Sequence, residues 1–105
     1  MGIVEIRAEK AGQITGVDWF YAHEVNAEDE VGPRLGSALG GSGTASFFLP
    51  AGQQYIGAKP RGPGQTQWLP VEISAGETTP TTIHQGWDTA LEYLVRSVRS
   101  SIRDQ

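Results

Sequence analysis

The chain has 105 residues, no cysteine and a formal net charge of −4. These values exclude a second domain, disulfide bonds, cysteine-ligated zinc and cysteine catalysis. The acidic balance argues against a nucleic-acid-binding protein, and no apolar run approaches the ~20 residues of a membrane-spanning helix. We expect a soluble protein, cytoplasmic if the chain is complete and exported if it is excised from a longer protein, and the compartment stays unknown.

Two strands are predicted near the N-terminus. Residues 3–8 alternate aliphatic and polar side chains, as expected of a strand with one wetter face. Residues 17–25 form the strongest predicted strand and contain three consecutive aromatic residues. Since side chains alternate along a strand, Phe20 and Ala22 lie on one face, and the other face is shared by Trp19, Tyr21, His23 and Val25. Large aromatic residues on both sides lead us to expect that both faces of this strand are covered.

A segment of low hydrophobicity follows at residues 26–43, with three consecutive acidic residues and a glycine-rich stretch. We interpret it as a long loop that holds at most a short edge strand around residues 34–39. Loops longer than ~12–15 residues are usually functional or disordered. This segment is therefore a candidate part of a ligand site.

The clearest indication of the fold is the segment 43–79, in which apolar runs stop at turns that contain proline or glycine. These runs lie at residues 45–49, 54–59 and 68–74. A last strand over residues 78–84 contains Pro80, which confines it to a sheet edge or to its first position. Strands with this spacing predict a mainly β protein, a small antiparallel β-sandwich of about six or seven strands, although a barrel or a single covered sheet stays open.

The periodicity changes near the C-terminus, where apolar residues recur at helical spacing. The stripe consists of Leu91, Leu94, Val95, Val98 and Ile102. A helix of about fifteen residues is marginal alone in water, so the stripe needs a surface to pack against. We therefore divide the chain into a β-sandwich domain over residues 1–86 and a C-terminal amphipathic α-helix over residues 87–105. The helix packs either on its own sheet or on a partner subunit.

Packing and turn residues within 43–79 carry a resemblance to a known group of folds. They are Phe47, Leu49, Pro50, Gly52, Tyr55, Ile56, Val71, Ile73, Gly76 and Thr78. This arrangement resembles prealbumin-like sandwiches, namely carboxypeptidase regulatory-like domains and small bacterial lipoprotein domains of unknown function. The resemblance implies a sandwich that acts as an accessory, adhesion or interaction module without catalytic residues. The acidic segment before Gly43 and the C-terminal helix depart from this pattern.

The sequence contains no recognisable catalytic or metal-binding motif. His23 and His84 would form a metal site only if their strands were neighbours, with Glu24 or Asp88 as a third ligand. The acidic residues 28–30 would bind calcium only if a turn gathered their carboxylates. Ordinary histidines and a solvated acidic loop are the favoured interpretations. We predict no catalytic residues, no metal and no cofactor, and keep a small hydrolase or metal-dependent enzyme around His23 as a third alternative.

Exposed aromatic residues on a β-sandwich can stack on sugar rings or hold a peptide. The candidates are Trp19, Tyr21, Trp68 and Trp87, and the favoured interpretation is that they belong to the core or lie under the terminal helix. Among these residues, Trp68 is the most suggestive because it follows a Gly/Pro-rich connection.

Two functions follow from these patterns. The leading hypothesis is a non-enzymatic interaction or structural module that self-associates, most simply as a homodimer through the stripe at residues 91–102. The alternative is a small-ligand or carbohydrate-binding sandwich that uses Trp68, Trp19, Tyr21 and the 26–43 loop. The expected partners are a second copy of the chain and a protein or glycan ligand, and not nucleic acid.

Overall fold

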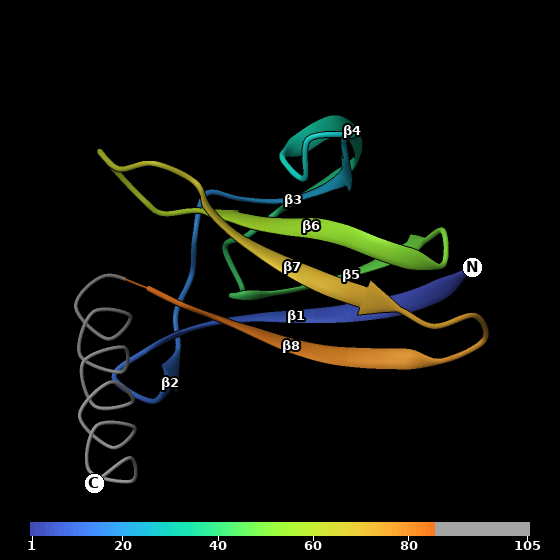
Figure 1. The fold of residues 1–105 in the computed structure, drawn as a ribbon. Coiled ribbons are helices and arrows are strands. Elements are labelled where there is room, and N and C mark those ends of the chain that lie inside the picture. Colours follow the sequence, from blue (N-terminus) through green and yellow to red (C-terminus); the bar gives the residue numbers. More distant parts are fainter. Residues whose placement is uncertain (86–105) are drawn as a thin grey trace, which may run out of the picture.

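The computed structural model describes residues 1–85. These residues form eight strands in two facing sheets (Figure 1). The strands are β1 (Gly2–Lys10), β2 (Gln13–Ile14), β3 (Trp19–Val25), β4 (Val31–Leu39), β5 (Thr44–Leu49), β6 (Gly52–Lys59), β7 (Gln67–Ile73) and β8 (Thr78–His84). The prediction of a mainly β sandwich is confirmed, although the strands number eight.

The predicted helix over residues 87–105 lies outside the described residues, together with the proposed interface residues Leu91, Leu94, Val95, Val98 and Ile102. Within residues 1–85 no helix is long and apolar enough to cross a membrane.

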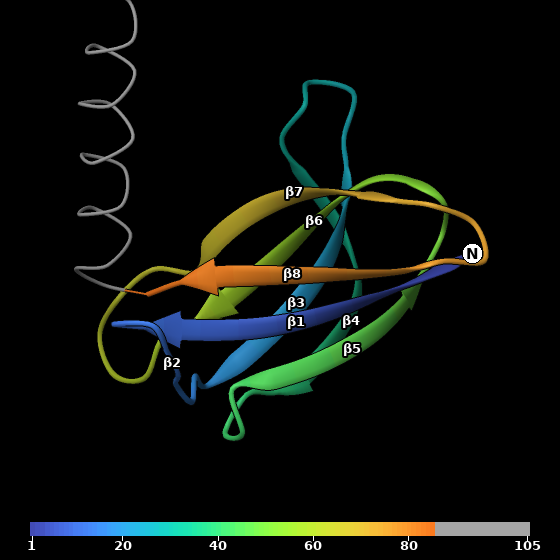
Figure 2. The same cartoon turned by 90° about the horizontal axis from the view of Figure 1, so that it is seen from below.

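The first sheet is built around β1, which lies between β5 and β8 (Figure 2). Its last residues also pair with the short strand β2. The pair of β1 and β8 is parallel, from Ile3 opposite Thr78 to Glu9 opposite His84. This parallel pair corrects the expectation of an entirely antiparallel sandwich. Side-chain alternation is the same in both strand directions, so periodicity carries no information about how two distant strands are oriented.

The second sheet has the strand order β4-β3-β6-β7, and all its pairs are antiparallel. Between the two sheets lies one apolar layer, to which β1 contributes alternate residues and β3 contributes Phe20 and Ala22, both fully buried. The buried apolar residues are Val4, Ile6, Ala8, Val17, Phe20, Ala22, Leu49, Ile56, Ala58, Val71, Ile73 and Ile83. The predicted division of β3 into two faces is confirmed, and the structure shows that the face with Phe20 and Ala22 is the inward one.

The segment 26–43 is not one long loop, because half of it is the nine-residue strand β4, which includes and extends the short edge strand considered around residues 34–39. A tight turn joins β3 to β4, in which the side-chain oxygen of Asn26 accepts hydrogen bonds from the backbone N–H groups of Glu28 and Glu30, each 2.9 Å long. Strand β4 is an edge strand with no fully buried residue. It is held largely by backbone pairing with β3, so it does not need the apolar composition by which strands are recognised.

Strand β8 lies at an edge of the first sheet, where β1 is its only partner among the described strands. It contains Pro80, which has no backbone N–H to donate to a second neighbour. The edge position predicted from this proline is confirmed.

Candidate aromatic ligand-binding face

The outer face of the second sheet brings together aromatic residues from two strands that are not adjacent. In β3, alternation places Trp19, Tyr21 and His23 in one outward row. In β6, Gly57 is paired with Tyr21 on one side and with Trp68 of β7 on the other. Since Gly57 has no side chain, the Trp68 ring lies across it and reaches the aromatic row of β3.

We call Trp19, Tyr21, His23 and Trp68 the aromatic face. The ring centroids of Trp19 and Tyr21 are 6.4 Å apart with their planes 18° from parallel. Those of Tyr21 and Trp68 are 6.2 Å apart with an angle of 34°. His23 meets Trp68 edge-on at 4.8 Å. These separations are typical of favourable aromatic pairs, so the four rings form one continuous cluster.

The aromatic face is accessible in the part of the chain that the structure describes. Trp19 is 39% exposed and Trp68 is 36% exposed, while Tyr21 and His23 are half-buried. The expectation that both faces of the β3 strand are covered is therefore wrong for residues 1–85. Each sheet of a two-layer sandwich buries one face against the other sheet and leaves the second face free.

A shallow depression of about 480 Å³ lies on the aromatic face. It is lined by Tyr21, His23, Arg34, Thr66 and Trp68. His23 Nδ1 is 2.7 Å from the carbonyl oxygen of Gly32 in β4. Because a carbonyl only accepts, Nδ1 carries the hydrogen of this bond, and Nε2 is the ring nitrogen that can meet a ligand. The depression thus combines aromatic rings with polar groups that can donate or accept hydrogen bonds.

The structure brings together three of the four aromatic candidates for a ligand site, Trp19, Tyr21 and Trp68, and the fourth, Trp87, lies outside the described residues. Sequence reasoning included Arg34 only as part of the 26–43 segment, and it did not assign His23 or Thr66 to that site. Alternation along β3 had already placed His23 on the same face as Tyr21, which is the signal that points to it. Arg34 had no comparable signal, because β4 is hard to recognise and its pairing with β3 shifts register around His23.

The histidine metal site considered from the sequence is not formed within residues 1–85. His23 lies in the second sheet and His84 lies in the first sheet. Among the described residues, no group of three histidine, aspartate or glutamate side chains could hold a metal ion.

The three acidic residues at positions 28–30 belong to the turn between β3 and β4, and all are exposed. Asp29 adopts a positive φ of 62°, and its carbonyl oxygen accepts a hydrogen bond of 2.8 Å from the Tyr55 hydroxyl. This bond fastens the turn to β6. The backbone of the turn, rather than its carboxylates, therefore makes its contacts with the sheet.

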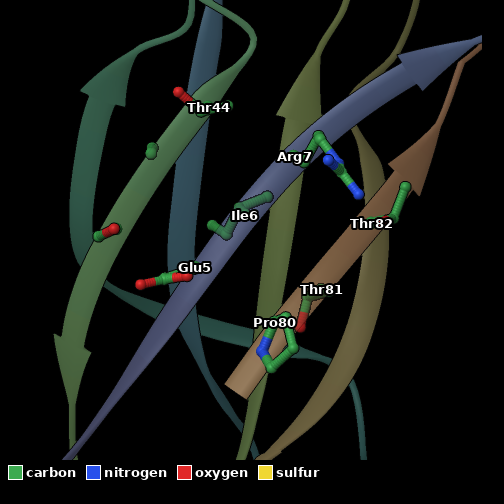
Figure 3. A pocket seen from close by; sticks show the side chains of 9 residues that line it. Glu5, Ile6, Arg7, Thr44, Pro80, Thr81 and Thr82 are labelled. Atoms are coloured by element: carbon green, nitrogen blue, oxygen red, sulfur yellow. The ribbon is translucent and has the colours of Figure 1, made fainter. Parts of the chain in front are cut away.

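A second hollow, of about 360 Å³, lies over the first sheet, where β1, β5 and β8 run side by side (Figure 3). Glu5 points toward β5 in this view, whereas Arg7 points toward β8. The remaining exposed lining is mainly threonine, serine and proline. Arg7 forms an ion pair of 2.9 Å with Glu9. This hollow has no aromatic residue, and its cation is already paired, so the aromatic face is the stronger candidate.

Replacing Gly57 with alanine tests the placement of Trp68. The added Cβ would lie 2.6 Å from Cζ3 and 2.7 Å from Cε3 of the indole, closer than Cβ atoms are found in proteins. The Trp68 ring must therefore move away from β6. We expect a red-shifted tryptophan emission and stronger iodide quenching, with an unchanged β-sheet circular dichroism spectrum.

The matched control is Gly41→Ala, because nothing lies within 4 Å of a Cβ at that glycine. This variant should have the emission spectrum of the unmodified protein. An unchanged emission spectrum in Gly57→Ala would contradict the close contact between Trp68 and β6.

Comparison with known protein families found no match for this chain, and no curated protein is similar to it. The functional argument therefore starts from the geometry of the aromatic face.

Proposed function

We propose that this protein is a non-enzymatic binding module that holds a carbohydrate, or a small ring-shaped ligand of similar size, on the aromatic face. The observation that carries the proposal is the meeting of Trp19 and Tyr21 with Trp68 on an exposed sheet surface. The apolar C–H face of a sugar ring packs well against such rings, which offer a large rigid surface at low entropic cost. The hydroxyl groups of the sugar would then meet the polar groups of the depression.

The exposure of these side chains supports the proposal. A tryptophan has more apolar surface to bury than most residues, and burying it would stabilise the fold. Two tryptophans are instead left more than one-third exposed and close to the same tyrosine. Contiguous exposed apolar surface of this kind marks interaction sites and ligand-binding grooves.

The proposal extends the resemblance to prealbumin-like domains, which implies an accessory or interaction role and no catalytic residues. It assigns the ligand-binding alternative to specific strands, β3 and β7, and it no longer needs a long 26–43 loop. From that segment it uses only Arg34 of β4, which lines the depression.

The test is a calorimetric titration with a panel of short oligosaccharides, carried out on the unmodified chain and on Trp68→Ala. Truncating a tryptophan at the centre of a binding surface costs about 2 kcal/mol, so we expect about thirtyfold weaker binding in this variant. The control is Phe48→Ala, which removes a 65% exposed aromatic side chain from the first sheet and should leave the affinity unchanged.

Two results would contradict the proposed function. One is the absence of binding to every member of the panel. The other is equal affinity of Trp68→Ala and the unmodified protein, which would mean that any sugar site lies elsewhere on the molecule.

Self-association stays a second proposal. One observation favours it within residues 1–85, since Ile3 and Phe48 are cross-strand partners on the outer face of the first sheet and are 38% and 65% exposed. An exposed apolar pair of this kind can contact a second copy of the chain. Light scattering across a tenfold range of concentration measures the solution mass and decides this point.

A further inference from the structure

The depression on the aromatic face has a cation and no acid in its lining. Arg34 contributes a guanidinium group, and none of Tyr21, His23, Thr66 and Trp68 is acidic. Within residues 1–85, Arg34 forms no ion pair and no side-chain hydrogen bond. A guanidinium group carries five N–H donors and no acceptor, so this side chain offers a complete set of donors to a ligand.

The lack of a partner for Arg34 does not follow from a shortage of carboxylates. The chain has 12 acidic residues against 8 lysine and arginine residues. Among the described cations, Arg7 pairs with Glu9 and the Lys59 ammonium donates to two backbone carbonyl oxygens. In this part of the chain, Lys10 and Arg61 are without such partners, as Arg34 is, but neither lines the depression on the aromatic face. An unpaired arginine beside the aromatic face of an acidic protein therefore suggests that its partner is the ligand.

We infer that the ligand is an acidic carbohydrate, in which a sugar ring packs on Trp68 and Tyr21 while its carboxylate binds Arg34. This inference rests on the proposed function and assigns the chemical class of its ligand. The planar guanidinium group matches the geometry of a carboxylate and binds it through two parallel hydrogen bonds. His23 and Thr66 line the same depression, and the hydroxyl groups of the ring would bind to His23 Nε2 and the Thr66 hydroxyl.

The experiment compares a trimer of galacturonic acid with its methyl ester, which differs from it by the lost charge and one added methyl group on each carboxyl. The ester keeps the sugar ring but removes the negative charge. We expect the protein to bind the acid roughly tenfold more tightly than the ester, because hydrogen bonds between charged groups are among the stronger ones in proteins. This preference should diminish as salt is added, since salt screens charges at an exposed site.

Three variants separate the contributions of charge and ring. Arg34→Gln should remove the preference for the acid, because the affinity for the acid falls much more than the affinity for the ester. Arg7→Gln makes the same change of charge on the opposite face of the sandwich and should keep the preference. Trp68→Ala should weaken the binding of both ligands. Arg34 is exposed, and its replacement is therefore not expected to unfold the protein.

The outcomes test the acidic ligand separately from the proposed binding of a carbohydrate to the aromatic face. The acid and the ester could bind equally, with the affinity unchanged in Arg34→Gln and weakened in Trp68→Ala. This result would overturn the acidic ligand but keep a sugar-binding aromatic face. Failure of both ligands to bind would overturn the acidic ligand, and the oligosaccharide panel would then decide the proposed function separately. A preference for the acid that survives in Arg34→Gln would overturn the role of Arg34.

Discussion

Replacing Phe20 with alanine should lower the free energy of unfolding by about 3–5 kcal/mol, the usual range for truncating a buried phenylalanine. Phe20 is the largest fully buried side chain in the described part of the molecule and has no exposed surface. It lies at the middle of the second sheet, in β3, which is paired on both sides. The strands on both sides of β3 are held to it by backbone hydrogen bonds, so they cannot easily move into the cavity that the missing ring leaves. We therefore expect the loss of stability to fall within this range.

Urea unfolding followed by circular dichroism measures this loss. The control is Phe48→Ala, because Phe48 is 65% exposed and should change stability by less than about 0.5 kcal/mol. Domains of this size are stable by about 5–15 kcal/mol, so Phe20→Ala could be partly unfolded in water. Phe20→Leu retains most of the volume and should show a smaller loss in the same direction. Equal effects of the Phe20 and Phe48 replacements would contradict the assignment of the inward face of β3.

Replacing Gly43 with alanine is expected to cost at least about 2 kcal/mol, because two penalties add. Gly43 has a positive φ of 81°, a backbone conformation that residues with a Cβ rarely adopt. A Cβ at this position would also lie 2.6 Å from the carbonyl oxygen of Thr15 and 2.6 Å from Cγ2 of Ile14. The contact with Thr15 involves backbone, which cannot move aside as a flexible side chain does.

The position of Gly43 explains why this effect should be large. Its N–H donates to the carbonyl oxygen of Gly40 at 2.9 Å, and its own carbonyl oxygen accepts from Ala8 at 2.8 Å. Gly40 in turn accepts a hydrogen bond of 2.8 Å from the N–H of Val17. The turn between β4 and β5 therefore connects the two sheets through backbone hydrogen bonds, and displacing Gly43 disturbs both sheets.

Gly76→Ala separates the two penalties at Gly43. Gly76 also has a positive φ, of 74°, but nothing lies within 4 Å of a Cβ there. It should therefore show only the conformational penalty of about 1 kcal/mol. The comparison uses the same denaturant titration, and equal losses for Gly43→Ala and Gly76→Ala would show that the close approach to Thr15 contributes nothing.

Much of the strand pattern could be predicted because it depends on local chemistry. Proline- and glycine-containing turns separate β5, β6 and β7 in the sequence, and alternation places Phe20 on one face of β3 and Trp19 with Tyr21 on the other. Alternation did not show which of these two faces lies in the core. Strand β4 was expected at most as a short edge strand around residues 34–39 within a loop, because an edge strand needs little hydrophobicity and gives a weak signal. The parallel pairing of β1 with β8 was also missed, since alternation does not reveal strand direction.

The sequence by itself determined which side chains share a face of each strand, and it placed Pro80 at a sheet edge. Both follow from backbone geometry within a few residues. Only the tertiary structure decided which strands lie next to each other. Trp68 reaches Tyr21 because β6 lies between their strands and presents Gly57, which has no side chain, at the point where the indole crosses. Arg34 joins them through the pairing of β4 with β3. The register between distant strands depends on the packing of the whole sandwich, so no local pattern could have assembled this face.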